Sequence, residues 1–429
     1  MITTRYVRDH IDMIKASLTK RKSDYPIDEL IGLDESWRSL TTKLQELQAQ
    51  KNRESIEIST MKKNGEDIRD RIASLAKLKE EITALEATLP TYSDRINYLL
   101  LSMPNTLHES VKYGADENFN IEVRKWGAPE KAIDIGHTEL LEKMGLVDTE
   151  RAAKVAGARF YYLKGDFVLL AKSLERFALD VMAKKGYTPV QPPYMMKREL
   201  YSGVTSLGDF GEMLYSIGRP KEAKIEDGAK EEELFMIATA EHPMAAMHAN
   251  EILNAKDLPI KYVGVSPCFR REAGTHGKDT KGIFRVHQFD KVEQFILCKK
   301  EDSWKYFEEV VRNEEEMFQS LGIPYRVIEM CTGDIGIVAA KKVDLEGWFP
   351  SQKRYREVTS ASNCTDWQSL RLDIKYDDKG ERHYVHTINA TAISIERALT
   401  AVAENYANRD GSISIPEVLI PYMGKSRIA

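Results

Sequence analysis

The strongest periodic pattern of apolar residues lies between residues 27 and 103. Its first half alternates steps of three and four residues from Leu30 to Leu47, and a second apolar series runs from Ile68 to Leu99 beyond a polar Asn-Gly turn. This spacing places the apolar side chains on one face of a helix. We therefore predict two long helices that pair as an antiparallel coiled-coil hairpin. Pro90 would remove a backbone hydrogen bond from the second helix, so we expect a kink or break there.

From about residue 105 the pattern changes to alternating strands and helices of medium length. Residues 166–185 carry apolar side chains at helical spacing, and residues 187–190, which come directly after them, are predicted to form a strand. The sequence contains neither a Rossmann G-x-G-x-x-G motif nor a P-loop. Residues 218–235 are densely charged and are predicted to form a solvated loop or an exposed hairpin.

Composition narrows the class of protein only moderately. Hydrophobic residues make up 42% and charged residues 30% of the 429 positions, and the net charge is −5. No run of eighteen apolar residues and no signal-peptide pattern occurs, so we expect a cytoplasmic protein without a membrane span. The four cysteines lie thirty or more residues apart, and this spacing is not typical of a zinc ribbon or a redox motif. We expect them to be reduced and buried, and we expect no protein-bound zinc.

One segment carries residues suited to a charged ligand. If Cys268–Gly274 begins a strand, alternation places Arg270 and Glu272 on one face and Arg271 on the other. A polar turn comes next, and residues 283–296 are predicted to be the return strand of a hairpin. A strand face with arginine, glutamate and aromatic side chains is costly to desolvate unless it meets a charged ligand. A solvated sheet face with an ordinary ion pair is the alternative.

Residues 268–295 resemble motif 2 of the class II aminoacyl-tRNA synthetases, and the chain resembles the seryl-tRNA synthetase family, especially its archaeal members, over essentially its whole length. Residues 186–193 resemble motif 1 with its terminal proline, and residues 389–397 resemble motif 3. Thr239-Ala-Glu241 and residues 356–363 resemble the serine-binding and metal-binding segments of the family. Several matches in the right order are more specific than any single one.

The resemblance implies an α+β fold, in which an antiparallel sheet core of the class II type is flanked by helices and preceded by the coiled-coil hairpin. It implies a tRNA-binding domain at residues 1–108, with its arm at about 27–103, and a catalytic domain at residues 109–429. The motif 1 helix and strand would form the interface of a homodimer.

In the family, the arm reaches the long variable arm of the serine tRNA and recognises shape and backbone more than bases. On the residues alone, a dimerisation coiled coil remains open, because the arm's 11 basic and 14 acidic residues give a net charge of 11 − 14 = −3. The candidate tRNA contacts are the basic residues Arg38, Lys43, Lys51, Arg53, Arg69, Arg71 and Lys77.

The activity implied is formation of seryl-adenylate from serine and ATP with Mg²⁺, followed by transfer of serine to tRNA(Ser). Arg270 and Arg397 would be catalytic, because negative charge develops on phosphoryl oxygens. Glu357 and Ser360 supply the hard oxygen ligands that Mg²⁺ prefers. The expected ATP-binding residues are Arg270, Arg271, Glu272, Arg285, Val286, Phe289, Glu357, Val358, Thr359, Ser360 and Arg397. The expected serine-binding residues are Thr239, Ala240, Glu241, Arg270, Glu293, Asn389 and Thr391.

Three other functions stay open at this point, and one of them is a class II enzyme for another amino acid, such as threonine or alanine. An amino-acid ligase that loads a carrier protein would share the catalytic core, although such enzymes typically lack the long arm. A non-catalytic binding protein on a synthetase fold would keep the architecture without the chemistry. The sequence does not reveal whether selenocysteine tRNA is also charged, nor the effect of Leu370, which stands where the family commonly has arginine.

Overall fold

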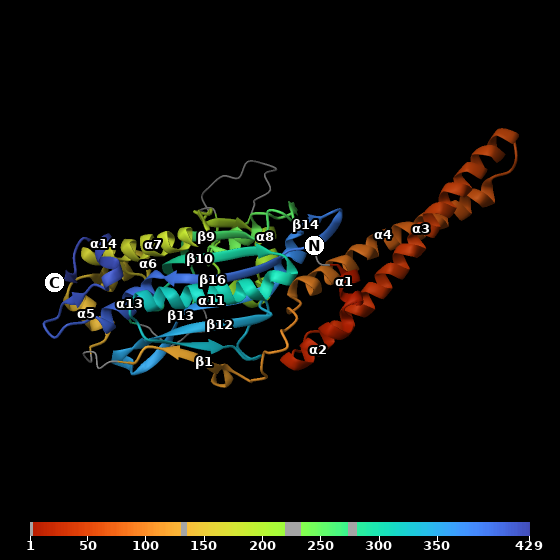
Figure 1. Ribbon diagram of the computed structural model, residues 1–429. Helices are drawn as coiled ribbons and strands as arrows, with labels where there is room; N and C mark the ends of the chain where they lie inside the picture. Colours follow the sequence, from red (N-terminus) through yellow and green to blue (C-terminus); the bar gives the residue numbers. More distant parts are fainter. Residues whose placement is uncertain (1–2, 130–134, 219–232, 273–280) are drawn as a thin grey trace. The chain divides into compact units, whose positions relative to one another are not determined.

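The computed structural model describes residues 3–129, 135–218, 233–272 and 281–429 (Figure 1). The chain divides into two compact units, Ile2–Pro104 and Asn105–Ala429. Among the described residues, none of the helices combines the length and the apolar character needed to cross a bilayer.

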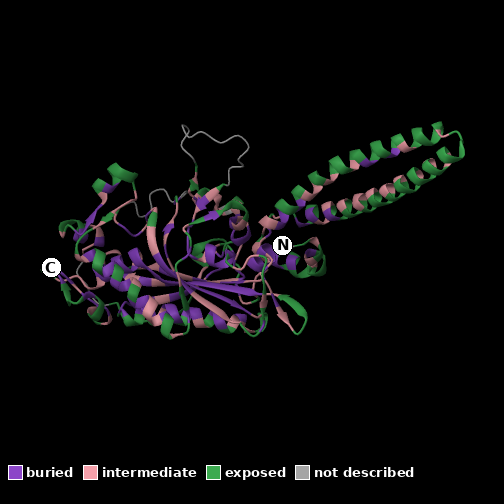
Figure 2. Cartoon of the chain, turned by 90° about the horizontal axis from the view of Figure 1, so that it is seen from above, coloured by how far each residue is buried: buried purple, intermediate pink, exposed green. Residues whose placement is uncertain are grey.

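The first unit is helical. Two short helices, α1 (Thr4–Asp9) and α2 (Ile11–Arg21), precede the long helices α3 (Ile27–Asn64) and α4 (Arg69–Ser102). The predicted hairpin of two long helices is confirmed, and Gly65 ends α3 with a left-handed φ of 77° that glycine adopts without steric cost. Between residues 41 and 77 no side chain is fully buried, as the exposed colouring along the hairpin shows (Figure 2).

Pro90 does not break α4. The helix is continuous from Arg69 to Ser102 with the proline inside it. Pro90 is exposed, so the carbonyl that loses its amide partner can be hydrated instead. The expected break was wrong for this reason.

The second unit is built on an eight-stranded sheet whose neighbouring strands are antiparallel, except for β4, which pairs parallel to β9. In order across the sheet the strands are β1 (Ile121–Trp126), β11 (Tyr325–Glu329), β12 (Lys341–Phe349), β13 (Arg354–Thr365), β16 (His386–Ser394), β10 (Gln288–Cys298), β9 (Ile260–Phe269) and β4 (Thr188–Val190). The expected antiparallel core of the class II type is confirmed.

Three helices, α7 (Asp166–Lys184), α11 (Ser303–Ser320) and α13 (Ile395–Asn405), pack on the central strands (Figure 1). Even-numbered side chains of β10 and β16, such as Val292 and Ile388, join one core with α7 and α11. Odd-numbered side chains further along β10, such as Phe295, join a second core with α8 (Arg198–Val204) and α10 (Glu241–Ala246). The helix and the strand predicted at residues 166–185 and 187–190 are confirmed as α7 and β4.

Smaller elements complete this unit. They are α5 (His137–Lys143), β2 (Val147–Asp148), α6 (Thr149–Ala156), β3 (Tyr162–Leu163), β5 (Met195–Lys197), α8 (Arg198–Val204), α9 (Leu207–Phe210), β6 (Ser216–Ile217), β7 (Leu234–Met236), α10 (Glu241–Ala246), β8 (Ile252–Asn254), α12 (Trp367–Leu372), β14 (Lys375–Asp378), β15 (Glu381–Tyr384), β17 (Ile413–Ser414), α14 (Ile420–Met423) and β18 (Arg427–Ile428).

The hairpin around the predicted motif 2 differs from the expectation. Strand β9 ends at Phe269 and β10 begins only at Gln288, so the alternation argument for Arg270 and Glu272 was wrong. Glu272 has a left-handed φ of 47°, which no strand residue adopts. The polar turn at 273–280 and most of the charged segment at 218–235 lie outside the described residues.

All four cysteines are free and buried, as expected. Within the ranges that the structure describes, no group of three or more His, Cys, Asp or Glu side chains is placed to hold a metal ion.

Candidate active site

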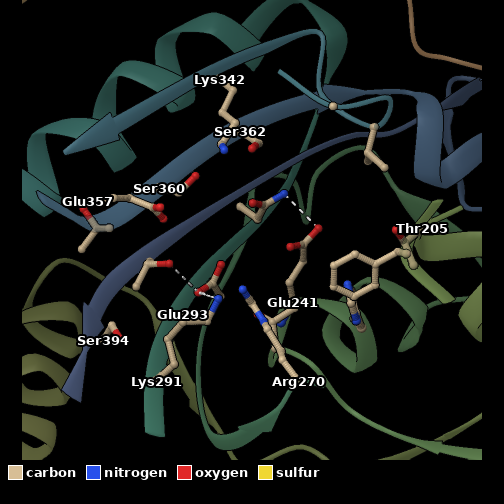
Figure 3. A pocket seen from close by; sticks show the side chains of 18 of the residues that line it. Thr205, Glu241, Arg270, Lys291, Glu293, Lys342, Glu357, Ser360, Ser362 and Ser394 are labelled. Carbon is tan, nitrogen blue, oxygen red and sulfur yellow. Dashed lines mark hydrogen bonds and ion pairs between the residues drawn. The ribbon is translucent and has the colours of Figure 1, made fainter. Parts of the chain in front are cut away.

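A cavity of about 390 Å³ lies over the centre of the large sheet (Figure 3). Its floor comes from β10, β13 and β16, and its walls come from the start of α10 and α13, from the segments that flank β9 and β10, and from residues 335–339. Because side chains alternate along a strand, Phe289, Lys291 and Glu293 of β10 all reach the cavity. The even-numbered side chains between them face the helices.

A bulge adjusts the register at the middle of the floor. Lys291 pairs with Ser394 and Val292 with Ile393, but Glu293 pairs with Thr391, so β16 carries one extra residue at this point. Because of this extra residue, Glu293 and Thr391 lie opposite each other and both face the cavity. Both side chains are buried.

Glu241 lies at one end of the cavity and is held by two amide groups. Its Oε1 accepts hydrogen bonds from Asn389 Nδ2 at 3.0 Å and from Gln368 Nε2 at 2.9 Å. Desolvation raises the pKa of Glu241 to about 7, and the charge of Glu293 adds to the rise, whereas Lys291, Gln368 and Arg270 oppose it. The backbone amide of Glu241 donates to Thr239 Oγ1 at 3.3 Å, so this hydroxyl supports the start of α10.

Glu293 receives two partners on a single oxygen. Lys291 Nζ lies 2.7 Å from Glu293 Oε2, and Thr391 Oγ1 donates to the same oxygen at 3.2 Å. Arg270 lies beside this group, with its guanidinium 5.2 Å from the centre of the Phe289 ring and its Nε donating to the carbonyl of Ala238 at 3.2 Å. This end of the cavity therefore offers two carboxylates, an amide and two cations within a small volume.

The other end is dominated by arginines. Arg397 Nη1 lies 3.0 Å from Glu357 Oε1 and donates to the Glu357 carbonyl at 3.1 Å. Although desolvation raises the pKa of Glu357, the charges of Arg397 and Lys342 hold it well below its usual value. Arg285 Nη1 donates to Glu272 Oε2 at 2.9 Å. Fixed cations and an ionised carboxylate are suited to phosphates and to a hard metal ion.

The cavity gathers nearly all of the predicted site residues. Every predicted ATP-binding and serine-binding residue lines it except Ala240 and Arg271. Ala240 is fully buried in the second core instead. Arg271 is exposed, and its backbone amide donates to the carbonyl of Met213, because the chain has left the strand direction after Phe269.

Other residues line the cavity without having been predicted. Lys291 stands two positions before Glu293 on one strand face, so alternation could have found it. Lys342 and Phe284 come from segments whose place in the site depends on the sheet order and carries no local signal. Phe284 lies between two guanidiniums, with its ring centre 5.2 Å from Arg397 and 4.2 Å from Arg356.

Partly buried arginines and buried carboxylates that line one cavity on an antiparallel sheet of this order define the catalytic core of a class II aminoacyl-tRNA synthetase. In agreement, residues 224–406 match the family described as tRNA synthetase class II core domain (G, H, P, S and T). Residues 1–107 match the family described as Seryl-tRNA synthetase N-terminal domain.

Relatives that match over their full length identify the family within this class of enzymes. The chain is 48% identical over 431 residues to a serine–tRNA ligase of Methanoculleus marisnigri, covering 99% of both chains. It superimposes with a TM-score of 0.87 on the seryl-tRNA synthetase of Pyrococcus horikoshii complexed with ATP, at 44% identity and over 100% of this chain and 99% of that chain. The cytoplasmic serine–tRNA ligase of Naegleria fowleri in complex with AMP gives a TM-score of 0.82 at 37% identity, over 97% and 95%. The chain belongs to the seryl-tRNA synthetase family.

Proposed function

We propose that this protein is an ATP-dependent serine–tRNA ligase that forms seryl-adenylate and then transfers serine to the 3′ end of tRNA(Ser). The observation that carries the proposal is the division of one cavity into two ends. Glu241, Glu293 and Thr391 gather at one end, and Arg285 and Arg397 gather at the other. The first end suits an amino acid with an ammonium group and a hydroxyl, and the second suits a triphosphate.

In the first step, a carboxylate oxygen of serine attacks the α-phosphorus of ATP, the bond to the β-phosphate breaks, and pyrophosphate leaves. Negative charge grows on the phosphoryl oxygens, so fixed cations contribute more than a proton-transfer group does. Arg270 supplies such a cation at the first end, and its charge also lowers the pKa of Glu357 at the other end. Its planar guanidinium can bind the serine carboxylate and the α-phosphate together.

ATP binding exchanges ion pairs within the protein for pairs with phosphate. Arg397 and Arg285 are paired with Glu357 and Glu272, so their guanidiniums are already held toward the cavity when the outer phosphates arrive. Glu272 then accepts a hydrogen bond from the adenine amino group, Phe289 stacks on the ring, and the backbone at Val286 contacts the base. Val358 and Thr359 line the nucleotide side.

Glu357 and Ser360 fit a magnesium ion. The carboxylate of Glu357 is ionised because Arg397 and Lys342 lower its pKa, and the Ser360 side chain points into the cavity near it (Figure 3). Both supply oxygen ligands of the kind that Mg²⁺ prefers when it also binds phosphates. When bound, the ion would neutralise phosphate charge.

Serine is recognised at the first end. Glu241 receives the ammonium group with Thr239 beside it, and Asn389 holds the Glu241 carboxylate in place. Glu293 and Thr391 bind the hydroxyl. A site built to hydrogen-bond a hydroxyl rejects the analogue without it much more strongly than an apolar pocket rejects a missing methylene. Threonine is refused because its additional methyl group needs volume.

In the second step, the terminal ribose hydroxyl of the tRNA attacks the carbonyl carbon of the adenylate and AMP leaves, with a phosphate oxygen of the adenylate as the candidate proton acceptor. We assign tRNA binding to residues 1–108, with contacts along the hairpin of α3 and α4, and catalysis to residues 109–429. A homodimer through α7 and β4 and a place in the cytoplasm, where translation uses the product, complete the proposal.

The test is ATP–pyrophosphate exchange measured with each of the twenty amino acids. We expect exchange with serine and none above background with alanine, glycine, cysteine or threonine. An equal rate with threonine would overturn the substrate, and no exchange with any amino acid would overturn the enzymatic function. Charging of tRNA(Ser) transcripts then tests the second step.

A further inference from the structure

Lys291 is a buried cation that the proposed mechanism leaves without a role. It lies on β10 two residues before Glu293, so the two side chains share the cavity face of the strand (Figure 3). Only 8% of the Lys291 side chain and 2% of the Glu293 side chain are exposed. A buried lysine is costly unless it is paired, and the pairing here is with one particular oxygen.

The two oxygens of Glu293 are not equivalent. Lys291 Nζ and Thr391 Oγ1 both lie against Oε2, at 2.7 Å and 3.2 Å. Among the described residues, Oε1 has no hydrogen-bond partner. The carboxylate is thus fixed by one oxygen and keeps the acceptor capacity of the other.

The surrounding charges make the lysine necessary for this arrangement. Glu293 and Glu241 both reach the same end of the cavity, and their charges repel each other. The cations that face them are Lys291 and Arg270. Their other neighbours include Cys268, Tyr201, Cys364, Gln368, Asn389, Thr391 and, from α11, Glu314. Arg270 is committed to the carboxylate and the phosphate in the proposed reaction, so Lys291 balances the second carboxylate.

We propose that Lys291 is a positioning residue for amino-acid selection, whose ammonium holds Oε2 of Glu293 so that Oε1 is presented to the hydroxyl of serine. This inference rests on the proposed function. Alanine would leave Oε1 as a desolvated acceptor without a donor, which costs binding energy. Without Lys291 the carboxylate is free to turn and to find other donors, so alanine is penalised less.

The experiment compares Lys291→Met, Lys291→Gln and Lys291→Arg in the full-length enzyme, with ATP–pyrophosphate exchange on serine and on alanine. For Lys291→Met and Lys291→Gln we expect the ratio of kcat/KM for serine over alanine to fall at least about tenfold, toward the modest discrimination of a pocket without a fixed acceptor. The loss should lie in KM for serine, with KM for ATP within about twofold, as uniform binding loss predicts. Lys291→Arg should restore most of the ratio.

The pH dependence of kcat/KM for serine is a second measurement, and a loss of stability in the variant would not shift it. The kcat/KM for serine should fall as pH drops through the Glu241 pKa of about 7, because a protonated carboxyl no longer binds an ammonium group and kcat/KM reports the free enzyme. Lys291 lowers that pKa. Removing it should therefore shift the acid limb of the profile, which is the fall in kcat/KM at low pH, to higher pH. Lys300→Met, an exposed lysine just beyond β10, is the matched control and should leave both the ratio and the profile unchanged.

Equal losses for serine and alanine, or a change confined to KM for ATP, would overturn the assignment, as would an unmoved acid limb. These results require a wild-type enzyme that exchanges with serine. If the wild type does not, the proposed function fails and the role of Lys291 fails with it, which is a distinguishable outcome. Because three replacements are compared, the loss of one variant to misfolding leaves the other two to decide.

Discussion

The helical hairpin and the catalytic sheet bury their side chains in opposite ways. Between residues 41 and 77 the hairpin buries no side chain fully, whereas every residue of β16 is buried. The hairpin is held by contacts between two adjacent helices, and the sheet is held by strands that come from distant positions in the chain. In the second unit, burial accordingly raises the pKa of carboxyl groups such as Glu241 and Glu314.

Binding a large, extended partner and running the chemistry therefore require different kinds of structure. An exposed hairpin presents surface along its whole length at little cost in folding free energy, because its side chains stay hydrated in the folded protein. A site that selects one small amino acid needs desolvated groups with fixed partners. Each region can be disturbed separately, and three experiments use this separation.

The largest effect is expected from shortening the hairpin. Gln48 Nε2 and Glu86 Oε1 lie 3.0 Å apart across the two helices, so residues 49–85 can be replaced by a short glycine turn that keeps the base of the hairpin. We expect charging of tRNA(Ser) to fall to background, because the proposed tRNA contacts are lost, while ATP–pyrophosphate exchange keeps its rate. Unchanged charging by the shortened protein would show that the hairpin does not bind the tRNA.

The next largest effect is expected on adenylate formation alone. We expect Arg270→Ala to raise the barrier to adenylate formation by about 2 to 4 kcal/mol, because the developing phosphoryl charge loses a fixed cation. Arg271→Ala is the matched control, since Arg271 is the neighbouring arginine but is exposed and away from the cavity. Single-turnover measurement of adenylate formation separates the two. A near-normal rate for Arg270→Ala would remove this residue from its assigned role.

The last effect concerns stability and leaves the reaction untouched. Glu314 of α11 is fully buried, and neither of its carboxyl oxygens has a hydrogen-bond partner among the described residues. Burial raises its pKa well above the ordinary value, and the charges of Asp344 and Glu293 add to the rise. The folded state therefore holds a proton that the unfolded state releases above its pKa of about 4.3, so stability falls as pH rises from that value, at up to about 1.4 kcal/mol per pH unit.

Glu314→Gln should remove this dependence, because the amide is neutral at every pH. We expect its melting temperature to exceed that of the wild type by more at pH 8 than at pH 5, while Glu308→Gln, an exposed position on the same helix, gives no such trend. A pH-independent difference for Glu314→Gln would contradict the buried, protonated state. The shortened protein should keep the dependence, since it belongs to the sheet.

The two regions also differ in how far the sequence predicted them. The helices α3 and α4 follow from residues three and four positions apart, and only the local exposure of Pro90 escaped the pattern. In the site, alternation alone brings Lys291 and Glu293 to one face, but it failed for Arg270 and Glu272 because the backbone turns to a left-handed φ of 47° at Glu272. That Glu241, Asn389 and Gln368 meet depends on sheet order, which short-range patterns do not contain. The resemblance to a known family supplied what local physics could not.

The extra residue of β16 opposite Val292 and Glu293 limits the insertions and deletions that this strand can tolerate. Removing or adding a single codon in that stretch would turn Thr391 away from the cavity and carry every later position of the strand to the wrong side. The coiled coil can instead grow or shrink by paired seven-residue units on its two helices. Length variation among descendants of this chain should accordingly collect at the hairpin and be nearly forbidden at the bulge.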